Sequence, residues 1–273
     1  MDNYYYHQQN ILNKIKTNYK GLKKELTQFY EEKYKPFHLQ QLENQTIPHR
    51  VLLLNNYYTA AEAFENQYKI TSQSKFRSSI LEEFNVYLFK DLPEIKELNL
   101  DFFNKGIYAG LKLDHNGQIA VITKDVDFCI GKRFVLTLEQ HELEIIIPLV
   151  AVEVKTYLDA TMYNEVQFSM QTIKNATPNV RTYLLMERNE VKADKIIASK
   201  TESPLDEIFV LRGTKEQPID EDTVYDYYLE ILAALRTNLD VELKVPGRLF
   251  KSTPKTLAPK HSTAAFAKVL QKH

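Results

Sequence analysis

The sequence predicts an α/β protein of the α+β kind, a mixed β-sheet flanked by helices, with an N-terminal helical arm. Apolar residues recur at helical spacing near both ends of the chain, and short apolar runs typical of strands fill the middle. The turn His115-Asn116-Gly117 joins two of these runs as a hairpin. A strand, a helix and another strand then follow, which is the order of a parallel crossover.

The N-terminal region contains one long predicted helix, over residues 10–32. Its apolar positions lie three or four residues apart: Leu12, Ile15, Tyr19, Leu22, Leu26 and Phe29. The next stretch is rich in Gln and Asn, and Pro36 and Pro48 are expected to interrupt regular structure there.

The central region begins with a helix from Ser74 to about Lys90. Three strands follow it, at Ile107–Leu113, Ile119–Ile130 and Leu149–Tyr157. Asp159 is a suitable N-cap for a helix that ends before Pro178. The last predicted elements are two strands, at Thr182–Met186 and Glu207–Leu211, and a helix that begins in Asp220-Glu221-Asp222 and ends at Arg236.

Composition excludes several classes of protein. Apolar residues make up 44% of the 273 residues, enough for a sizeable core. No apolar run is long enough for a transmembrane helix, so no membrane partner is expected. The single cysteine, Cys129, reads as a core residue, and the histidines lack the spacing of zinc ligands. These features favour a cytosolic protein, and the basic run after Leu243, without any acidic residue, suits phosphate contact.

The strand Leu149–Lys155 carries the sharpest chemical signal. Side chains alternate along a strand, so Val150, Val152 and Val154 share one face while Glu153 and Lys155 share the other. A carboxylate and an ammonium group thus lie side by side at the end of an apolar strand, where each needs a partner or a ligand. A plain salt bridge on a half-buried sheet is the alternative interpretation.

A second acidic position lies upstream, at Asp125 or Asp127. We favour Asp127 because it directly precedes the apolar run Phe128-Cys129-Ile130, but Asp125 remains possible. If this strand lies beside the Glu153 strand, carboxylates gather near one lysine and favour a hard divalent cation such as Mg²⁺. Asp127 and Glu153 would hold the metal, and Lys155 would stabilise developing charge or orient the attacking water.

At these residues the sequence resembles the PD-(D/E)XK nuclease superfamily, with Val126 in place of the proline. The segments SKFRSSILEEF, DVDFCIG, AVEVKTYLDATM and DEIFVLRG are similar to type II restriction endonucleases of the BbvCI and DdeI group. This resemblance implies a sequence-specific, Mg²⁺-dependent endonuclease acting on double-stranded DNA. It also implies a homodimer or a heterodimer with a related nuclease subunit, since a duplex has two strands to cut.

The resemblance further implies a helical glutamate near the metal. Glu83 is preferred over Glu82, because it borders the apolar stripe of its helix. The expected organisation is an N-terminal helical arm for DNA contact or dimerisation over residues 1–70, a nuclease core over 71–240 and a basic tail over 241–273. Candidates for reading bases are Asn55, Asn56, Gln73, Lys75, Arg77 and Arg212. A repair or recombination nuclease of the same fold and a non-catalytic DNA-binding partner are the alternative functions.

Overall fold

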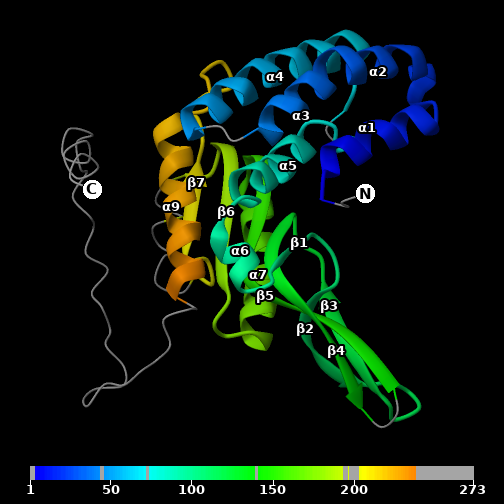
Figure 1. The fold of residues 1–273 in the computed structure, drawn as a ribbon, viewed down its shortest axis with the longest axis vertical. Helices are drawn as coiled ribbons and strands as arrows, with labels where there is room; N and C mark the ends of the chain where they lie inside the picture. The colour runs from blue at the N-terminus through cyan, green and yellow to red at the C-terminus, as the bar shows by residue number, and fades with distance from the viewer. Residues whose placement is uncertain are drawn as a thin grey trace, which may run out of the picture. The chain divides into compact units, whose positions relative to one another are not determined.

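The computed structural model describes residues 4–43, 46–71, 74–138, 141–192, 196 and 203–237. The predicted basic tail, residues 241–273, therefore lies outside the described residues. Four helices form the N-terminal region: α1 (Tyr6–Lys16), α2 (Lys23–Phe29), α3 (Lys35–Leu42) and α4 (Ile47–Tyr68). Short helical turns at Tyr19–Gly21 and Tyr30–Tyr34 connect the first three. Figure 1 shows α4, α2 and α3 above one end of the sheet.

Two expectations about this region are wrong. The predicted helix over residues 10–32 is broken, because Asn18 and Lys20 adopt left-handed conformations with φ of 49° and 52°. Pro36 and Pro48 both lie inside helices: Pro36 lies just after the π-helical turn Tyr30–Tyr34, and Pro48 lies in the first turn of α4, where the missing N–H has no helical acceptor to lose. Thr46 caps α4 by accepting the backbone N–H of His49 at 3.4 Å.

The remaining elements form a sheet and the helices that flank it. The helices are α5 (Ser78–Phe89), α6 (Pro93–Glu97), α7 (Ala160–Ala176) and α9 (Glu221–Thr237). The strands are β1 (Asp101–Phe103), β2 (Ile107–Leu113), β3 (Ile119–Lys124), β4 (Phe128–Leu138), β5 (His141–Leu158), β6 (Arg181–Asn189) and β7 (Glu207–Val210). They form one mixed sheet in the order β1-β4-β5-β2-β3, with β6 beside β5 and β7 beside β6. The predicted mixed sheet flanked by helices is therefore the observed fold.

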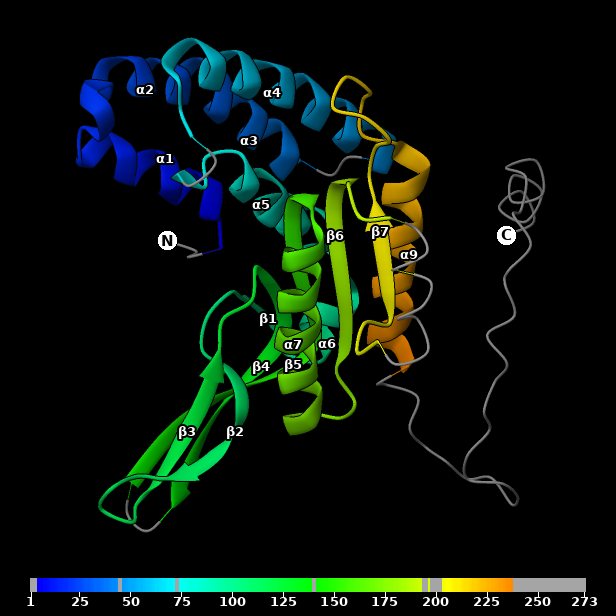
Figure 2. The same cartoon turned by 180° about the vertical axis from the view of Figure 1, so that it is seen from behind.

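The sheet is covered by helices on both faces. Val150, Val152 and Val154 of β5 belong to a hydrophobic cluster with α4, α5 and α9, so the N-terminal helices and the sheet share a core. Ala151 and Leu158 face the opposite side and pack against α7. Figures 1 and 2 show α7 and α9 on opposite faces of the sheet. The alternation of β5 therefore separates an apolar core face from the face that carries Glu153.

The strand boundaries differ from the prediction in one informative place. The expected strand Ile119–Ile130 is divided, because β3 pairs with β2 while β4 changes partner and pairs with β5. The pairs β2–β3 and β4–β5 extend away from the rest of the molecule in both views (Figures 1 and 2). The break leaves Asp125 and Asp127 in the connection, immediately before β4.

The crossover after β5 agrees with the sequence. Asp159 caps α7 by accepting the amides of Thr161 and Met162, both at 2.8 Å. The chain returns through β6, which is parallel to β5. Among the described residues, no helix has the length and apolarity needed to cross a membrane.

Candidate active site

The pairing of β4 with β5 decides which acidic residues meet. Phe128 lies opposite Val152 in the antiparallel register, so the residue before Phe128 falls beside Glu153 and Val154. The backbone N–H of Val154 donates to Asp127 Oδ2 at 2.9 Å. The strand that carries Glu153 therefore holds the carboxylate of Asp127 in place.

Asp127, Glu153 and Lys155 form one cluster, called here the carboxylate–lysine cluster. Lys155 Nζ donates to Asp127 Oδ2 at 3.0 Å and to Glu153 Oε2 at 2.8 Å. The two carboxylates thus converge on a single nitrogen atom. The Lys155 side chain is 27% exposed, against 16% for Asp127 and 11% for Glu153, so the cluster is partly open to solvent.

The surroundings change the protonation of all three groups. Burial raises the pKa of Asp127, but the charge of Lys155 and the Val154 N–H outweigh burial and hold that pKa below its ordinary value. Burial and the charge of Asp127 raise the pKa of Glu153 to about 7. Burial lowers the pKa of Lys155, but Asp127 and Glu153 outweigh burial and raise it. Lys155 is therefore a firmly protonated ammonium group beside one ionised carboxylate and one that titrates near neutrality.

Glu82, on α5, belongs to the electrostatic surroundings of this cluster. Burial and the charge of Asp127 raise the pKa of Glu82 to about 8. The charge of Glu153 also raises this pKa, whereas the charges of Lys75 and Lys155 lower it. Lys75, at the start of the segment before α5, has a left-handed backbone with φ of 54°. Glu82 therefore lies within electrostatic range of all three cluster residues.

Glu83, the helical glutamate that the sequence favoured, does not join the cluster. Its carboxylate accepts hydrogen bonds from the Gln8 N–H at 2.9 Å, the Tyr34 hydroxyl at 2.8 Å and the Tyr87 hydroxyl at 2.5 Å. The choice of Glu83 assumed a helix with one solvent face, but every residue of α5 from Ser79 to Phe89 is buried. An apolar stripe cannot separate inside from outside on a helix that is covered all round.

Asp125, the alternative acidic residue, also lies apart from these interactions. It is exposed, and its Oδ1 accepts the backbone N–H of Gly106 at 3.1 Å.

Ser169 of α7 was not foreseen as a residue of the site, although the helix register is clear from the sequence. Its hydroxyl lies 3.5 Å from Glu153 Oε1, at the limit of a hydrogen bond.

The donor set suits a hard divalent cation. Two carboxylates meet at one point, and Glu82 adds negative charge beside them. Among the described residues, no three Asp, Glu, His or Cys side chains form a ready-made metal cage. Mg²⁺ needs no such cage, since one or two carboxylates commonly hold it together with water and substrate phosphate. The residues present therefore fit this group.

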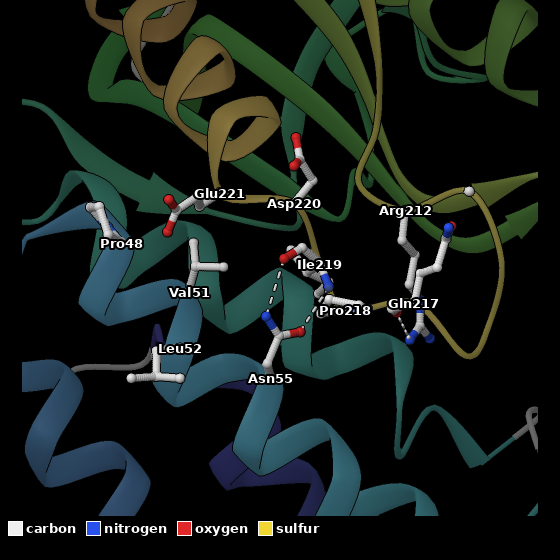
Figure 3. A pocket seen from close by; sticks show the side chains of 11 residues that line it. Pro48, Val51, Leu52, Asn55, Arg212, Gln217, Pro218, Ile219, Asp220 and Glu221 are labelled. Carbon is white, nitrogen blue, oxygen red and sulfur yellow. Dashed lines mark hydrogen bonds between the residues drawn. The ribbon is translucent and has the colours of Figure 1, made fainter. Parts of the chain in front are cut away.

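A cavity away from the cluster explains some of the other polar residues. A cavity of about 510 Å³ lies between α4 and the segment from β7 to α9 (Figure 3). Asn55 lines it, with its amide bonded to the Ile219 N–H at 2.8 Å and the Ile219 carbonyl at 3.1 Å. Arg212 also lines it but is buried against Glu187. Asn55 and Arg212, two of the six candidates for reading bases, are thus bonded within the protein. A third candidate, Gln73, lies outside the described residues.

Comparisons with known proteins bear on the family and the fold of the chain. The sequence model of a family described as the Bpu10I restriction endonuclease matches residues 73–240. The solved structure described as the native BbvCI A2B2 tetramer at low resolution contains a chain with the same fold, at a TM-score of 0.66. The two chains are 17% identical, and the match covers 86% of this chain and 97% of the other. Among curated proteins there is no match.

Proposed function

Because the chain belongs to the Bpu10I restriction endonuclease family and is a sequence-specific DNA endonuclease, we propose that the carboxylate–lysine cluster is its hydrolytic centre. Asp127 and Glu153 would hold a Mg²⁺ ion, with Glu82 as the additional acidic residue. The convergence of both carboxylates on Lys155 Nζ carries this proposal. It supports a site where one cation and one phosphate fit between fixed charges.

The roles of the residues follow from their protonation. When bound, the cation polarises a phosphoryl oxygen and lowers the pKa of a water molecule. Lys155 keeps its proton, so it acts as a hydrogen-bond donor and positive charge toward the phosphate rather than as a general base. Glu153 titrates near neutrality, which suits a group that must be ionised to work and can receive a proton.

Asp127 has a different role, set by its own contacts. Its pKa stays below the ordinary value, so it supplies a permanent negative charge at neutral pH. The Val154 N–H fixes one of its oxygens, and Lys155 binds the same oxygen. Asp127 is therefore the anchor of the site, while Glu153 and Glu82 adjust their charge when the cation and substrate arrive.

We extend the proposal to a second nuclease subunit. One cluster of this kind hydrolyses one bond, whereas duplex DNA has two strands. The similar fold occurs in a structure described as an A2B2 tetramer, which supports assembly with a like or a related chain. The basic segment 241–273 and the N-terminal arm, residues 1–70, would add DNA or subunit contacts, and the expected place of action is the bacterial cytosol.

Digestion of genome-sized DNA tests the proposal directly. The purified chain is incubated with DNA and Mg²⁺, alone and with a related subunit, and both strands are sequenced at the new ends. We expect breaks at one short sequence, no breaks after EDTA treatment and recovery on adding Mg²⁺. Breaks at branched or damaged sites would favour a repair nuclease. Intact DNA under every condition would reject the proposed centre.

A further inference from the structure

A second cavity lies beyond the end of the strand that carries Lys155. Its volume is about 200 Å³, and it is lined by Glu65, Arg77, Ser78, Thr156, Tyr157, Arg188 and Lys215. These residues come from α4, the start of α5, the ends of β5 and β6, and the segment after β7. The side chains that line this small cavity therefore include three cations and three hydroxyl groups but only one carboxylate.

Two separate elements connect this cavity to the carboxylate–lysine cluster. Ser78 and Glu82 lie four residues apart on α5, so they share a face and are about 6 Å apart along the helix axis. Lys155 and Tyr157 lie two residues apart on β5, on the same face and about 7 Å apart. The cavity is therefore a short step from the cluster, measured along either element.

The cations of the cavity keep donors for an additional ligand. Arg188 donates its Nε to Glu190 Oε1 at 3.0 Å and lies over the Tyr157 ring at 5.6 Å. Among the described residues, no acceptor is bonded to its two terminal nitrogens, which form a fork suited to phosphate. No partner within that part of the chain takes up the hydroxyl groups of Ser78, Thr156 or Tyr157 either.

The carboxylates around the cavity must be counted too. Arg77 is bonded to the buried Glu187 at 2.9 Å, and both Arg77 and Lys215 contact Glu62. These pairs hold the cations in place without closing the cavity. Burial raises the pKa of Glu65 to about 7, so the one carboxylate that lines the cavity loses part of its charge near neutrality.

We propose that this cavity binds a backbone phosphate of the DNA strand that is being cut, one or two nucleotides from the scissile bond. Arg188 and Lys215 are the positioning residues, and Ser78, Thr156 and Tyr157 supply neutral hydrogen bonds. This inference rests on the proposed function, because the proposed function places the scissile bond at the carboxylate–lysine cluster. The phosphate contact fixes the strand along its length, so that the reacting phosphate falls between Lys155 and the carboxylates.

The test measures DNA binding of the full chain without divalent metal, so that it does not depend on cleavage. The double variant Arg188→Gln with Lys215→Gln is compared with Arg181→Gln on a fluorescein-labelled duplex of random sequence, over a series of salt concentrations. Arg181 is the matched control, because it also lies on β6 and pairs with an acidic residue, Asp206, but at the other end of the strand.

The expected result is a weaker complex and a smaller salt dependence for the double variant alone. Each lost phosphate contact lowers the slope of log affinity against log salt by about 0.9, or roughly tenfold in affinity at moderate salt. An unchanged slope for the double variant overturns the inference. So does an equal loss in Arg181→Gln, which would indicate a general effect of charge.

A second measurement distinguishes a DNA phosphate from a loosely bound anion. Once the cleaved sequence is known, neutral methylphosphonates replace single phosphates beside the cut. One position should weaken wild-type binding and leave the double variant unaffected, because that contact is already absent. Equal losses in both proteins at every position would contradict the assignment. Failure of cleavage with the expected salt slopes would instead reject the proposed function and retain the cavity.

Discussion

Two neighbouring glutamates on α5 are both buried, but in different surroundings. Glu82 lies within electrostatic range of Asp127, Glu153 and Lys155, and burial together with the charge of Asp127 raises its pKa to about 8. Glu83 is surrounded by hydroxyl groups and backbone amides, and burial raises its pKa to about 7 despite the hydrogen bonds that lower it. A raised pKa alone therefore does not identify an active site. The neighbours decide, because charged neighbours allow chemistry whereas three fixed donors provide structure.

The largest expected effect comes from a substitution in the carboxylate–lysine cluster beside Glu82. Lys155→Ala removes the donor shared by Asp127 and Glu153 and should lower the cleavage rate by about a hundredfold to a thousandfold. DNA binding should be largely retained. Lys174→Ala is the control, because Lys174 also forms an ion pair, with Asp206 at 2.8 Å. Plasmid nicking provides the measurement, and undiminished nicking by Lys155→Ala would rule the centre out.

The next largest effect is expected on stability, from a substitution of Glu83. Glu83→Ala leaves the Tyr34 hydroxyl, the Tyr87 hydroxyl and the Gln8 N–H without their acceptor. We expect the free energy of unfolding to fall by about 3 kcal/mol, because buried donors lose their partner. Urea unfolding measures this loss. Cleavage per folded molecule should stay close to wild type, and a selective loss of catalysis would assign Glu83 to the site after all.

Glu82→Gln tests whether Glu82 and Glu83 have different roles, because this substitution removes a charge and keeps the shape of the side chain. Cleavage should fall by about tenfold to a hundredfold, as expected for a residue that adjusts a metal site. Stability should not fall, since the variant removes a carboxylate whose ionisation is opposed by Asp127. Glu83→Gln is the matched control for cleavage. Equal cleavage by both variants would contradict the different roles of the two faces.

The pH dependence distinguishes activity from stability. Glu82 and Glu153 must be ionised to hold a cation, so cleavage should rise with pH through about 7 to 8. Stability should change in the opposite direction. Above the ordinary pKa of a glutamate the unfolded chain has lost these protons while the folded chain retains them, so folding weakens as pH rises toward 8. Thermal unfolding across this range should show a smaller fall for Glu82→Gln.

The smallest expected effect concerns the second aspartate. Asp125→Asn should change cleavage little, because Asp125 is exposed and its carboxylate accepts only the Gly106 N–H among the described residues. Asp127→Asn is the matched comparison and should reduce cleavage strongly. If the two variants behaved alike, the register of β4 and β5 would not explain which aspartate matters.

Patterns along the chain were enough to predict much of the local structure and the local chemistry. The alternation of Leu149–Lys155 was enough to place Glu153 and Lys155 on one face, and the Asp159 cap was enough to start α7. Both depend on neighbours along the chain, so they can be read without the fold. Prolines were harder, because a proline can end a helix or lie within its first turn, and Pro36 and Pro48 both lie within helices.

Which residues meet across elements depends on the pairing of strands and the packing of helices. The pairing of Phe128 with Val152 brings Asp127 to Lys155 and leaves Asp125 at a loop, although both precede the same apolar run. Inside the protein, where both glutamates of α5 are buried, Glu82 lies within electrostatic range of the cluster and Glu83 accepts hydrogen bonds from tyrosines. Periodicity gives the spacing of side chains around an element. It does not give what covers each face, because that depends on contacts between residues far apart in the chain.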